Sequence, residues 1–248
     1  MAFLTCSTAS NALGKCIQYN VVIPEKHDEN TPNVLLLHGL SDDHTVWQRL
    51  TSIERYANER GICVIMPDGG RSFYTDMKYG GAYYTCIVND VLESAHNLFN
   101  ISTKREKNFT AGLSMGGYGA VKIALRNPER FAGCASLSGA LKITTQANSK
   151  IWNVDFTSIW GEDFTETIPG SQDDLIALID TFDGSDKPKP KIFAACGDED
   201  FLLDDNRFFR DYISGKGFDL TYEEHPGNHN WLFWDTYIQR AIDVLLGK

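Results

Sequence analysis

The sequence lacks the features of several protein classes. Basic residues are few: 23 Lys and Arg stand against 33 Asp and Glu, a formal net charge of −10. This charge argues against nucleic acid or an anionic membrane surface as a partner. No run of about eighteen apolar residues is present, so we expect no transmembrane helix. The start of the chain has no basic segment followed by a long apolar one, so we expect no signal peptide and a cytoplasmic protein.

Cysteine and histidine give no metal-binding pattern. The six cysteines include no C-x-x-C motif, so zinc binding and redox chemistry are not expected. His225 and His229 are four residues apart, but Pro226-Gly227 between them rules out a common helix. We therefore expect no metal, no cofactor and a reducing compartment.

Apolar runs indicate the fold class. Residues 33–39, 62–68 and 191–197 are apolar without alternation, which is typical of strands buried on both faces. They alternate with helical segments, which predicts an α/β fold with a mainly parallel central sheet and helices on both faces. Further strands are expected at 15–23, 131–139 and 218–224, and helices at 45–60, 85–99, 118–125, 173–182, 204–216 and 231–246. No linker or repeat is visible, so residues 1–248 should form a single domain.

A G-x-S-x-G motif lies near the middle of the chain, with Gly112, Ser114 and Gly116 at its fixed positions. A short apolar segment precedes it and a helical segment follows, which is the strand–turn–helix context that this nucleophile motif requires. The serine of such a motif sits at a sharp turn, so both glycines must be small enough for strand and helix to approach. The pattern predicts that Ser114 is a nucleophile. The alternative is a glycine-rich turn in which Ser114 only caps a helix.

A serine hydroxyl needs a histidine base, and that base needs a carboxylate. In hydrolases with this motif the chain order is serine, acid, histidine, each in a loop after a strand. The base must therefore come from the end of the chain. His229 lies in the loop between the last predicted strand and the last helix, whereas His225 is still at the end of the strand. We expect His229 to be the base, with His225 as the alternative.

The acid should follow the strand at 191–197, where several carboxylates compete. They are Asp198, Glu199, Asp200, Asp204 and Asp205. Asp200 lies at the apex of the loop, before an apolar Phe201-Leu202-Leu203 that would anchor the loop in the core. Asp204 and Asp205 resemble acids in the first turn of a helix. Asp198 is the serious rival to Asp200, although it could simply close the turn.

An oxyanion hole needs two backbone donors that point at the developing negative charge. One is expected from the N–H of Met115, which follows the serine at the start of a helix. The other is expected after the buried strand at 33–39, where the N–H of Leu40 is in place. His38 is expected to be structural and to hydrogen-bond a nearby loop.

Several stretches together carry a family resemblance. They are Leu36-Leu37-His38-Gly39, Met66-Pro67-Asp68, Ser72-Phe73-Tyr74-Thr75-Asp76, Gly112-Leu113-Ser114-Met115-Gly116-Gly117-Tyr118-Gly119-Ala120, Cys196-Gly197-Asp198-Glu199-Asp200-Phe201-Leu202 and His229-Asn230-Trp231-Leu232-Phe233-Trp234-Asp235. With them the chain resembles the esterase D-like branch of the α/β-hydrolases, from about residue 15 to 240. This branch includes tributyrin and acetyl esterases, the acetyl and feruloyl esterases of carbohydrate esterase family 1, and S-formylglutathione hydrolases.

The resemblance implies an α/β-hydrolase fold and a catalytic triad of Ser114, Asp200 and His229. In this family the acid is the aspartate before the Phe-Leu pair, which corresponds to Asp200. The oxyanion donors correspond to Leu40 and Met115. One departure is Asn228, because relatives often carry an acidic residue just before the histidine.

We therefore expect a serine carboxylic ester hydrolase that acts through an acyl-enzyme on short acyl esters, acetyl to butyryl, including acetylated or feruloylated sugars. Its partner would be a small-molecule ester, and a homo-oligomer is compatible with the sequence. One alternative is an S-formylglutathione hydrolase, which should carry basic residues where Asp42-Asp43, Asp68 and Asp76 stand. Another is a non-catalytic binding protein, which usually lacks a member of the triad.

Residues from 140 to about 170 are irregular and would form a short cap-like insertion above the nucleophile. The insertion carries Trp152 and Trp160. Together with Trp231, just beyond His229, these residues are candidates for substrate binding at the acyl pocket. The plainer alternative is that they pack the insertion onto the domain.

Overall fold

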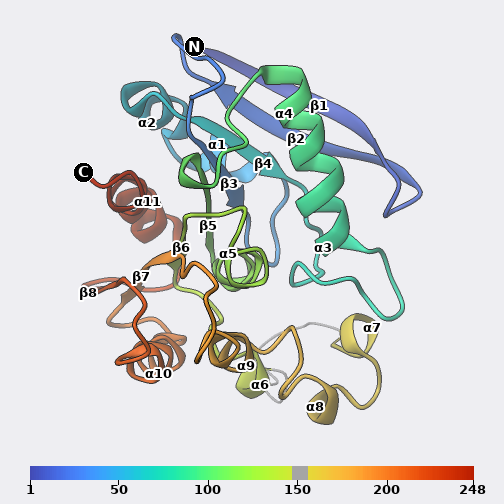
Figure 1. The fold of residues 1–248 in the computed structure, drawn as a ribbon, viewed down its shortest axis with the longest axis vertical. Helices are drawn as coiled ribbons and strands as arrows, with labels where there is room; N and C mark the ends of the chain where they lie inside the picture. The colour runs from blue at the N-terminus through green and yellow to red at the C-terminus, as the bar shows by residue number, and fades with distance from the viewer. Residues whose placement is uncertain (147–155) are drawn as a thin grey trace.

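The structure is a computed structural model that describes residues 1–146 and 156–248. Its centre is a sheet of eight strands in the order β1-β2-β4-β3-β5-β6-β7-β8 (Figure 1). β2 is antiparallel to β1 and β4, and all pairs from β4 to β8 are parallel. The strands are β1 (Ala2–Ser10), β2 (Lys15–Ile23), β3 (Asn33–Leu37), β4 (Cys63–Pro67), β5 (Asn108–Leu113), β6 (Gly133–Leu137), β7 (Lys191–Gly197) and β8 (Leu220–His225).

Helices connect the parallel strands. They are α1 (Val46–Leu50), α2 (Ile53–Arg60), α3 (Tyr83–Thr85), the π-helical turn η1 (Cys86–Val91), α4 (Leu92–Phe99), the 3₁₀ turn η2 (Arg105–Lys107), α5 (Met115–Arg126), α6 (Ile143–Gln146), α7 (Phe156–Trp160), α8 (Phe164–Thr167), α9 (Leu175–Asp180), α10 (Leu203–Ile213) and α11 (Trp231–Leu245).

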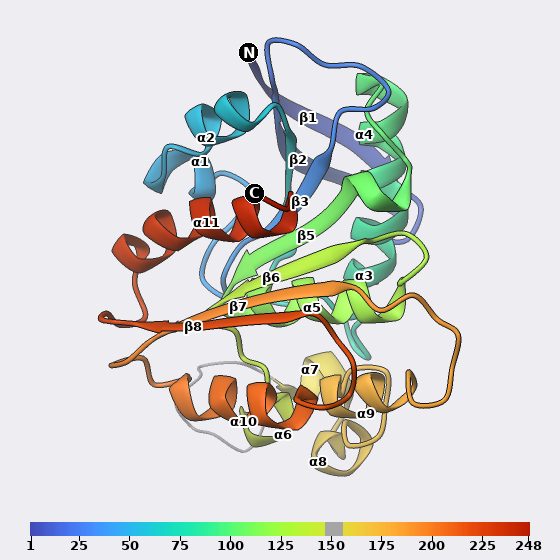
Figure 2. The same cartoon turned by 60° about the vertical axis from the view of Figure 1, so that its left-hand side comes forward.

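The sheet separates two hydrophobic cores. Leu35 and Leu37 of β3 belong to the core shared with α4 and α5, whereas Leu36 belongs to the core shared with α1, α2 and α11. Figure 2 shows α1, α2 and α11 on one side of the sheet and α4 on the other. Because both faces are buried, alternate residues of a strand enter different cores and the strand sequence is apolar throughout. The predicted α/β-hydrolase architecture is confirmed.

The parallel strands bring four loops to one edge of the sheet. The loops that follow β3, β5, β7 and β8 carry Leu40, Ser114, Asp200 and His229. Carboxyl ends of parallel strands lie at the same edge, which is where open α/β sheets bind their ligands. Residues far apart in the sequence can therefore meet at this edge.

Two parts of the fold differ from the sequence prediction. Strand β1 was not predicted, because it is an edge strand whose residues are mostly exposed or half-buried rather than continuously apolar. The predicted helix over 45–60 is interrupted between α1 and α2. Thr51 has an extended backbone, and its hydroxyl donates to Trp47 O and accepts from the Ile53 N–H. A side-chain hydroxyl that bonds to nearby backbone competes with the helix.

Other boundaries shift by a few residues. The helix predicted at 85–99 begins at Tyr83 and contains a π-helical turn, and α9 and α10 are shorter than predicted. The insertion at 140–170 includes α6, α7 and α8, and its position as a cap-like element stays a prediction. Over the two described ranges, no helix combines the length and the apolar character needed to span a membrane.

Candidate active site

Ser114 lies at the tight junction between β5 and α5. Its backbone has φ 53° and ψ −117°, a strained conformation for a residue with a side chain. A Cβ on Gly112 would lie 2.4 Å from Gly116 O, and a Cβ on Gly116 would lie 2.5 Å from Leu37 O. Strand and helix therefore touch through their backbones, and both motif positions exclude any side chain. This geometry holds Ser114 Oγ at the carboxyl edge of the sheet.

His229 bridges Ser114 and Asp200. Its Nε2 lies 3.0 Å from Ser114 Oγ, and its Nδ1 lies 2.9 and 3.1 Å from the two carboxylate oxygens of Asp200. The Asp200 side chain is fully buried. A carboxylate only accepts hydrogen bonds, so the proton of neutral His229 resides on Nδ1, and Nε2 is free to accept from the serine hydroxyl. The three residues predicted from the sequence are therefore brought together in a hydrogen-bonded line.

The loop after β7 holds Asp200 by its own backbone. The Leu202 N–H donates to Asp200 Oδ1 at 2.8 Å, and Leu202 is buried in the core. Phe201, which was predicted to help anchor this loop in the core, does not do so. Its side chain is 49% exposed, and its ring lies 4.5 Å from the imidazole of His229, between centroids. Of Phe201, Leu202 and Leu203, Leu202 is the one that is fully buried, while Phe201 covers the histidine.

The rival candidates from the sequence lie elsewhere. Asp198 Oδ1 accepts from the Gly227 N–H at 3.0 Å, so it fastens the loop that carries His229. His225 ends β8, where its Nε2 lies 3.1 Å from Glu223 Oε2 and its ring stacks on Tyr237. Neither residue contacts Ser114 in the described structure.

The start of α5 and the segment after β3 each place one more predicted residue beside the serine. Met115 is the first residue of α5, so its N–H has no acceptor within the helix. Leu40 lines the same cavity as Ser114. His38 Nδ1 donates to Gly39 O at 2.7 Å, and its Nε2 accepts from the Gly69 N–H at 2.8 Å. Since Gly39 C=O and Leu40 N–H belong to one planar peptide, the imidazole fixes the direction in which the Leu40 N–H points.

A cavity of about 500 Å³ opens over Ser114 and His229. It is lined by Leu40, Ser41, Asp42, Arg71, Leu113, Ser114, His229, Asn230, Trp231 and Trp234. Burial raises the pKa of Asp42. The wall is thus apolar on the side of the two tryptophans and polar near Asp42 and Arg71, a combination that suits a small ester with one apolar part.

The three tryptophans predicted to bind substrate have different positions. Trp231 lines the cavity. Trp160 does not: its indole N–H donates to Asp173 Oδ2 at 2.9 Å, and its ring stacks on Phe156. The insertion uses Trp160 for its own packing, as the plainer alternative proposed. Trp152 falls outside the described residues.

Sequence reasoning missed Arg71 and Trp234 as residues of the cavity wall. Trp234 follows Trp231 by three positions at the start of α11, so their helical spacing places both on one side. That spacing was a usable signal. Arg71 lies in the long loop after β4, where no local pattern shows which side chains turn toward the serine.

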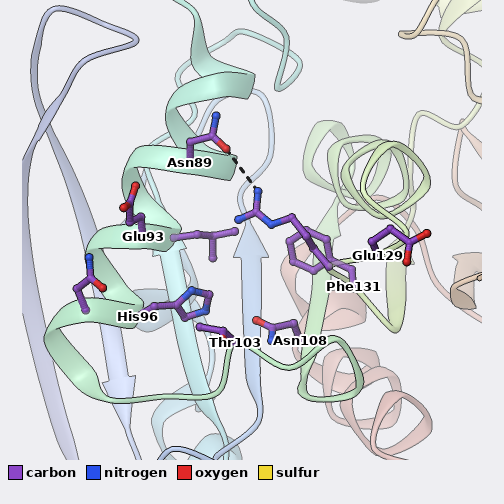
Figure 3. Close-up of a pocket in the computed structure, with 10 residues that line it drawn as sticks. Asn89, Glu93, His96, Thr103, Asn108, Glu129 and Phe131 are labelled. Atoms are coloured by element: carbon purple, nitrogen blue, oxygen red, sulfur yellow. Dashed lines mark hydrogen bonds between the residues drawn. The ribbon is translucent and has the colours of Figure 1, made fainter.

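A second cavity of about 390 Å³ lies between α4 and the start of β5 (Figure 3). Asn108 opens β5, and the opposite end of this strand leads to Ser114, so this cavity lies at the amino-terminal edge of the sheet. His96 and Arg130 contribute to its wall, and burial lowers the pKa of His96. The described residues around it do not include a serine–histidine pair.

Comparisons with known proteins agree with this arrangement. The family model described as "Putative esterase" matches residues 10–242. The acetyl esterase of Caldicellulosiruptor saccharolyticus is 34% identical over 223 residues, which cover 87% of this chain and 83% of that protein.

Two solved structures from Staphylococcus aureus are similar over their whole length. The fluorophosphonate-binding serine hydrolase F has a TM-score of 0.92 at 35% identity and covers 100% of this chain and 99% of its own. The S-formylglutathione hydrolase FrmB has a TM-score of 0.89 at 36% identity, with 99% and 98% covered. The chain therefore belongs to the esterase family of the α/β-hydrolase fold and is a carboxylic ester hydrolase.

Proposed function

We propose that Ser114, His229 and Asp200 form a catalytic triad that hydrolyses short acyl esters through an acyl-enzyme. The single observation that carries the proposal is the 3.0 Å contact between Ser114 Oγ and His229 Nε2, with the Asp200 carboxylate buried behind the imidazole. His229 takes the proton of Ser114 as the hydroxyl attacks the ester carbonyl. Asp200 stabilises the resulting imidazolium, and the N–H groups of Leu40 and Met115 receive the oxyanion.

Acylation ends when the alcohol departs, and deacylation by water follows. His229 gives its proton to the departing alcohol, which leaves the acyl group on Ser114. Water then enters, loses a proton to His229, and attacks the acyl-enzyme at the same oxyanion site; the bond to Ser114 Oγ breaks, His229 returns the proton to that oxygen, and the carboxylic acid leaves. A fluorophosphonate probe tests the nucleophile directly: one adduct on Ser114, absent from Ser114→Ala, is expected. Labelling of the variant at an equal rate would contradict the proposal.

The size of the cavity supports short acyl groups as substrates. Trp231, Trp234 and Leu113 give it an apolar wall beside Ser114. The similar protein of C. saccharolyticus is an acetyl esterase, and acetyl is a short acyl group, so this likeness supports the same proposal. Methylenes beyond the cavity would stay in water and gain little of the ~0.8 kcal/mol that each buried CH₂ contributes.

With p-nitrophenyl esters, kcat/KM is therefore expected to be high from acetyl to butyryl and to fall steeply beyond about eight carbons, where added methylenes are no longer buried. A series from C2 to C12 on purified protein measures this. Trp231→Ala serves as the matched variant: because it removes part of the apolar wall, it should lower kcat/KM for butyryl esters more than for acetyl esters. A maximum at C10 or above in the wild type would refute the short-chain assignment.

Thioester hydrolysis is the second candidate, and one observation favours it. Arg71 lines the cavity, which gives a cation where the sequence alone showed mainly acidic loops. A carboxylate on the leaving group, as in S-formylglutathione, would suit it. Comparing kcat/KM for S-formylglutathione with that for p-nitrophenyl acetate, in wild type and Arg71→Gln, separates the two candidates. A loss confined to S-formylglutathione supports the thioesterase, whereas an equal effect on both supports the general short-chain esterase.

A further inference from the structure

Lys122 is a buried cation on α5, the helix that follows Ser114. Its side chain is fully buried, two helical turns after the serine. The ammonium donates to Phe73 O at 3.0 Å, Thr75 Oγ1 at 2.7 Å and Asp173 Oδ1 at 2.9 Å. An ammonium has three N–H donors, so each one is used. Such a complete set marks a site built around the charged form of this side chain.

Two of these bonds hold a strained turn. Phe73 and Tyr74 are consecutive residues with positive φ, 49° and 51°, which costs free energy for residues with side chains. The hydroxyl of Tyr74 donates to His38 O at 2.9 Å, and its ring fills the space beside Gly119, where a Cβ would lie 2.4 Å from Cδ2. The turn that Lys122 holds therefore reaches the segment of His38 and Leu40.

The third bond connects the same ammonium to Asp173, between the insertion and α9. Asp173 receives Lys122 on one carboxylate oxygen and the indole N–H of Trp160 on the other. Trp160 and Phe156 pack on the ring of Phe73, with centroids 5.8 and 5.5 Å away. The insertion is thus seated on the strained turn and fastened to α5 through one ion pair.

We propose that Lys122 is a positioning residue that keeps the Leu40 N–H in place through the Phe73–Tyr74 turn, with Asp173, just after the insertion, as its counter-charge. This inference rests on the proposed role of Leu40 as an oxyanion donor. An oxyanion donor acts mainly in the transition state, so its displacement lowers kcat more than it changes KM. Loss of the ammonium should therefore appear in kcat.

Charge on Lys122 depends on its surroundings. Burial lowers its pKa to about 8, while the Asp173 carboxylate acts in the opposite direction. Arg126 also lowers this pKa, and Asp76 raises it; the ring of Tyr118 lies 4.8 Å from the ammonium. A neutral amine has two N–H groups for three acceptors. Deprotonation above pH 8 therefore releases at least one of the three contacts, two of which hold the strained turn.

Stability changes in the opposite direction to activity. The pKa of Lys122 is about 8 in the folded state, compared with 10.5 for a lysine in the unfolded chain. Between these values the unfolded chain binds more protons, so this group makes the free energy of unfolding rise with pH. Global unfolding through this group would therefore not explain a decrease in kcat as the pH rises through 8. Such a decrease, without unfolding, is the result expected if deprotonated Lys122 releases its contacts.

The experiment measures kcat and KM for p-nitrophenyl acetate from pH 6 to 10, with circular dichroism at each pH. In the wild type, kcat is expected to fall several-fold around pH 8. In Asp173→Asn the fall should move to lower pH, because the carboxylate that raises the pKa of Lys122 is gone. Lys122→Met should have a kcat about tenfold lower at pH 7, no decrease around pH 8, and an almost unchanged KM. Lys26→Met, at an exposed lysine, is the matched control and should behave as wild type.

A purely structural Lys122 would not move a pH profile. The proposal is overturned if the decrease around pH 8 is missing from the wild type, or keeps its midpoint in Asp173→Asn, or appears in KM alone. If Lys122→Met does not fold, the wild type and Asp173→Asn still decide the matter. Failure of the triad would appear separately, as a Ser114→Ala variant that keeps its activity.

Discussion

Replacing Ser114 with alanine is expected to lower kcat roughly 10³-fold or more. Alanine removes the only oxygen that lies 3.0 Å from His229 Nε2 among the contacts described for this site. What remains is binding and the oxyanion donors, which alone give a small part of the rate. Steady-state kinetics with p-nitrophenyl acetate on purified protein measures the change.

Ser136 offers a matched control on the neighbouring strand. It pairs in register with Gly112, is fully buried, and its hydroxyl has no hydrogen-bond partner in the described structure. Ser136→Ala removes the same atom from a similar environment and should leave kcat close to wild type. Retention of more than a tenth of the activity by Ser114→Ala would refute the assignment of the nucleophile.

Asp200→Asn is expected to cost nearly as much, with the fold intact. The amide of asparagine can donate to His229 Nδ1, which leaves the ring proton on Nε2 and removes the acceptor that Ser114 requires. Substitution of the equivalent aspartate in serine proteases lowers kcat by roughly 10⁴, and an effect of at least 10³ is expected here. Thermal unfolding of the variant should show that the folded structure survives.

Asp198→Asn separates this effect from simple damage to the loop. Asp198 accepts from the Gly227 N–H, and an asparagine side-chain oxygen can accept the same bond. Its activity should therefore decrease little. A larger loss in Asp198→Asn than in Asp200→Asn would show that the acid has been assigned to the wrong residue.

The sequence predicted those parts of the fold that depend on local pattern. Strands β2 and β7 have the expected bounds, because their residues are apolar or strongly β-forming over the whole run. The short motif around Ser114 was readable because backbone contact at Gly112 and Gly116 leaves no choice of residue. The relative positions of Ser114, Asp200 and His229 could be predicted because each residue lies in a loop after a strand, in the order serine, acid, histidine along the chain.

Features that depend on distant partners could not be predicted. Trp160 was expected near the substrate, but its partner Asp173 becomes visible only when the insertion is folded. Phe201 is an apolar residue of the kind expected in a core, yet its side chain is exposed and covers His229. The neighbouring Leu202 is the residue that is buried. Lys122 reads as an ordinary helix residue, and only the three acceptors around its ammonium distinguish it.

The backbone contact between β5 and α5 has a consequence for how the protein tolerates mutation. Ser114 is located by peptide groups that touch at Gly112 and Gly116, and not by the shapes of the surrounding apolar side chains. Exchanges such as Leu125→Met or Ile123→Val would alter the free energy of unfolding while leaving the hydroxyl in place. In a randomised library selected for ester cleavage, variation should therefore accumulate in the core beneath α5 and be absent from these two glycines. Stability and catalysis could then drift independently in this molecule.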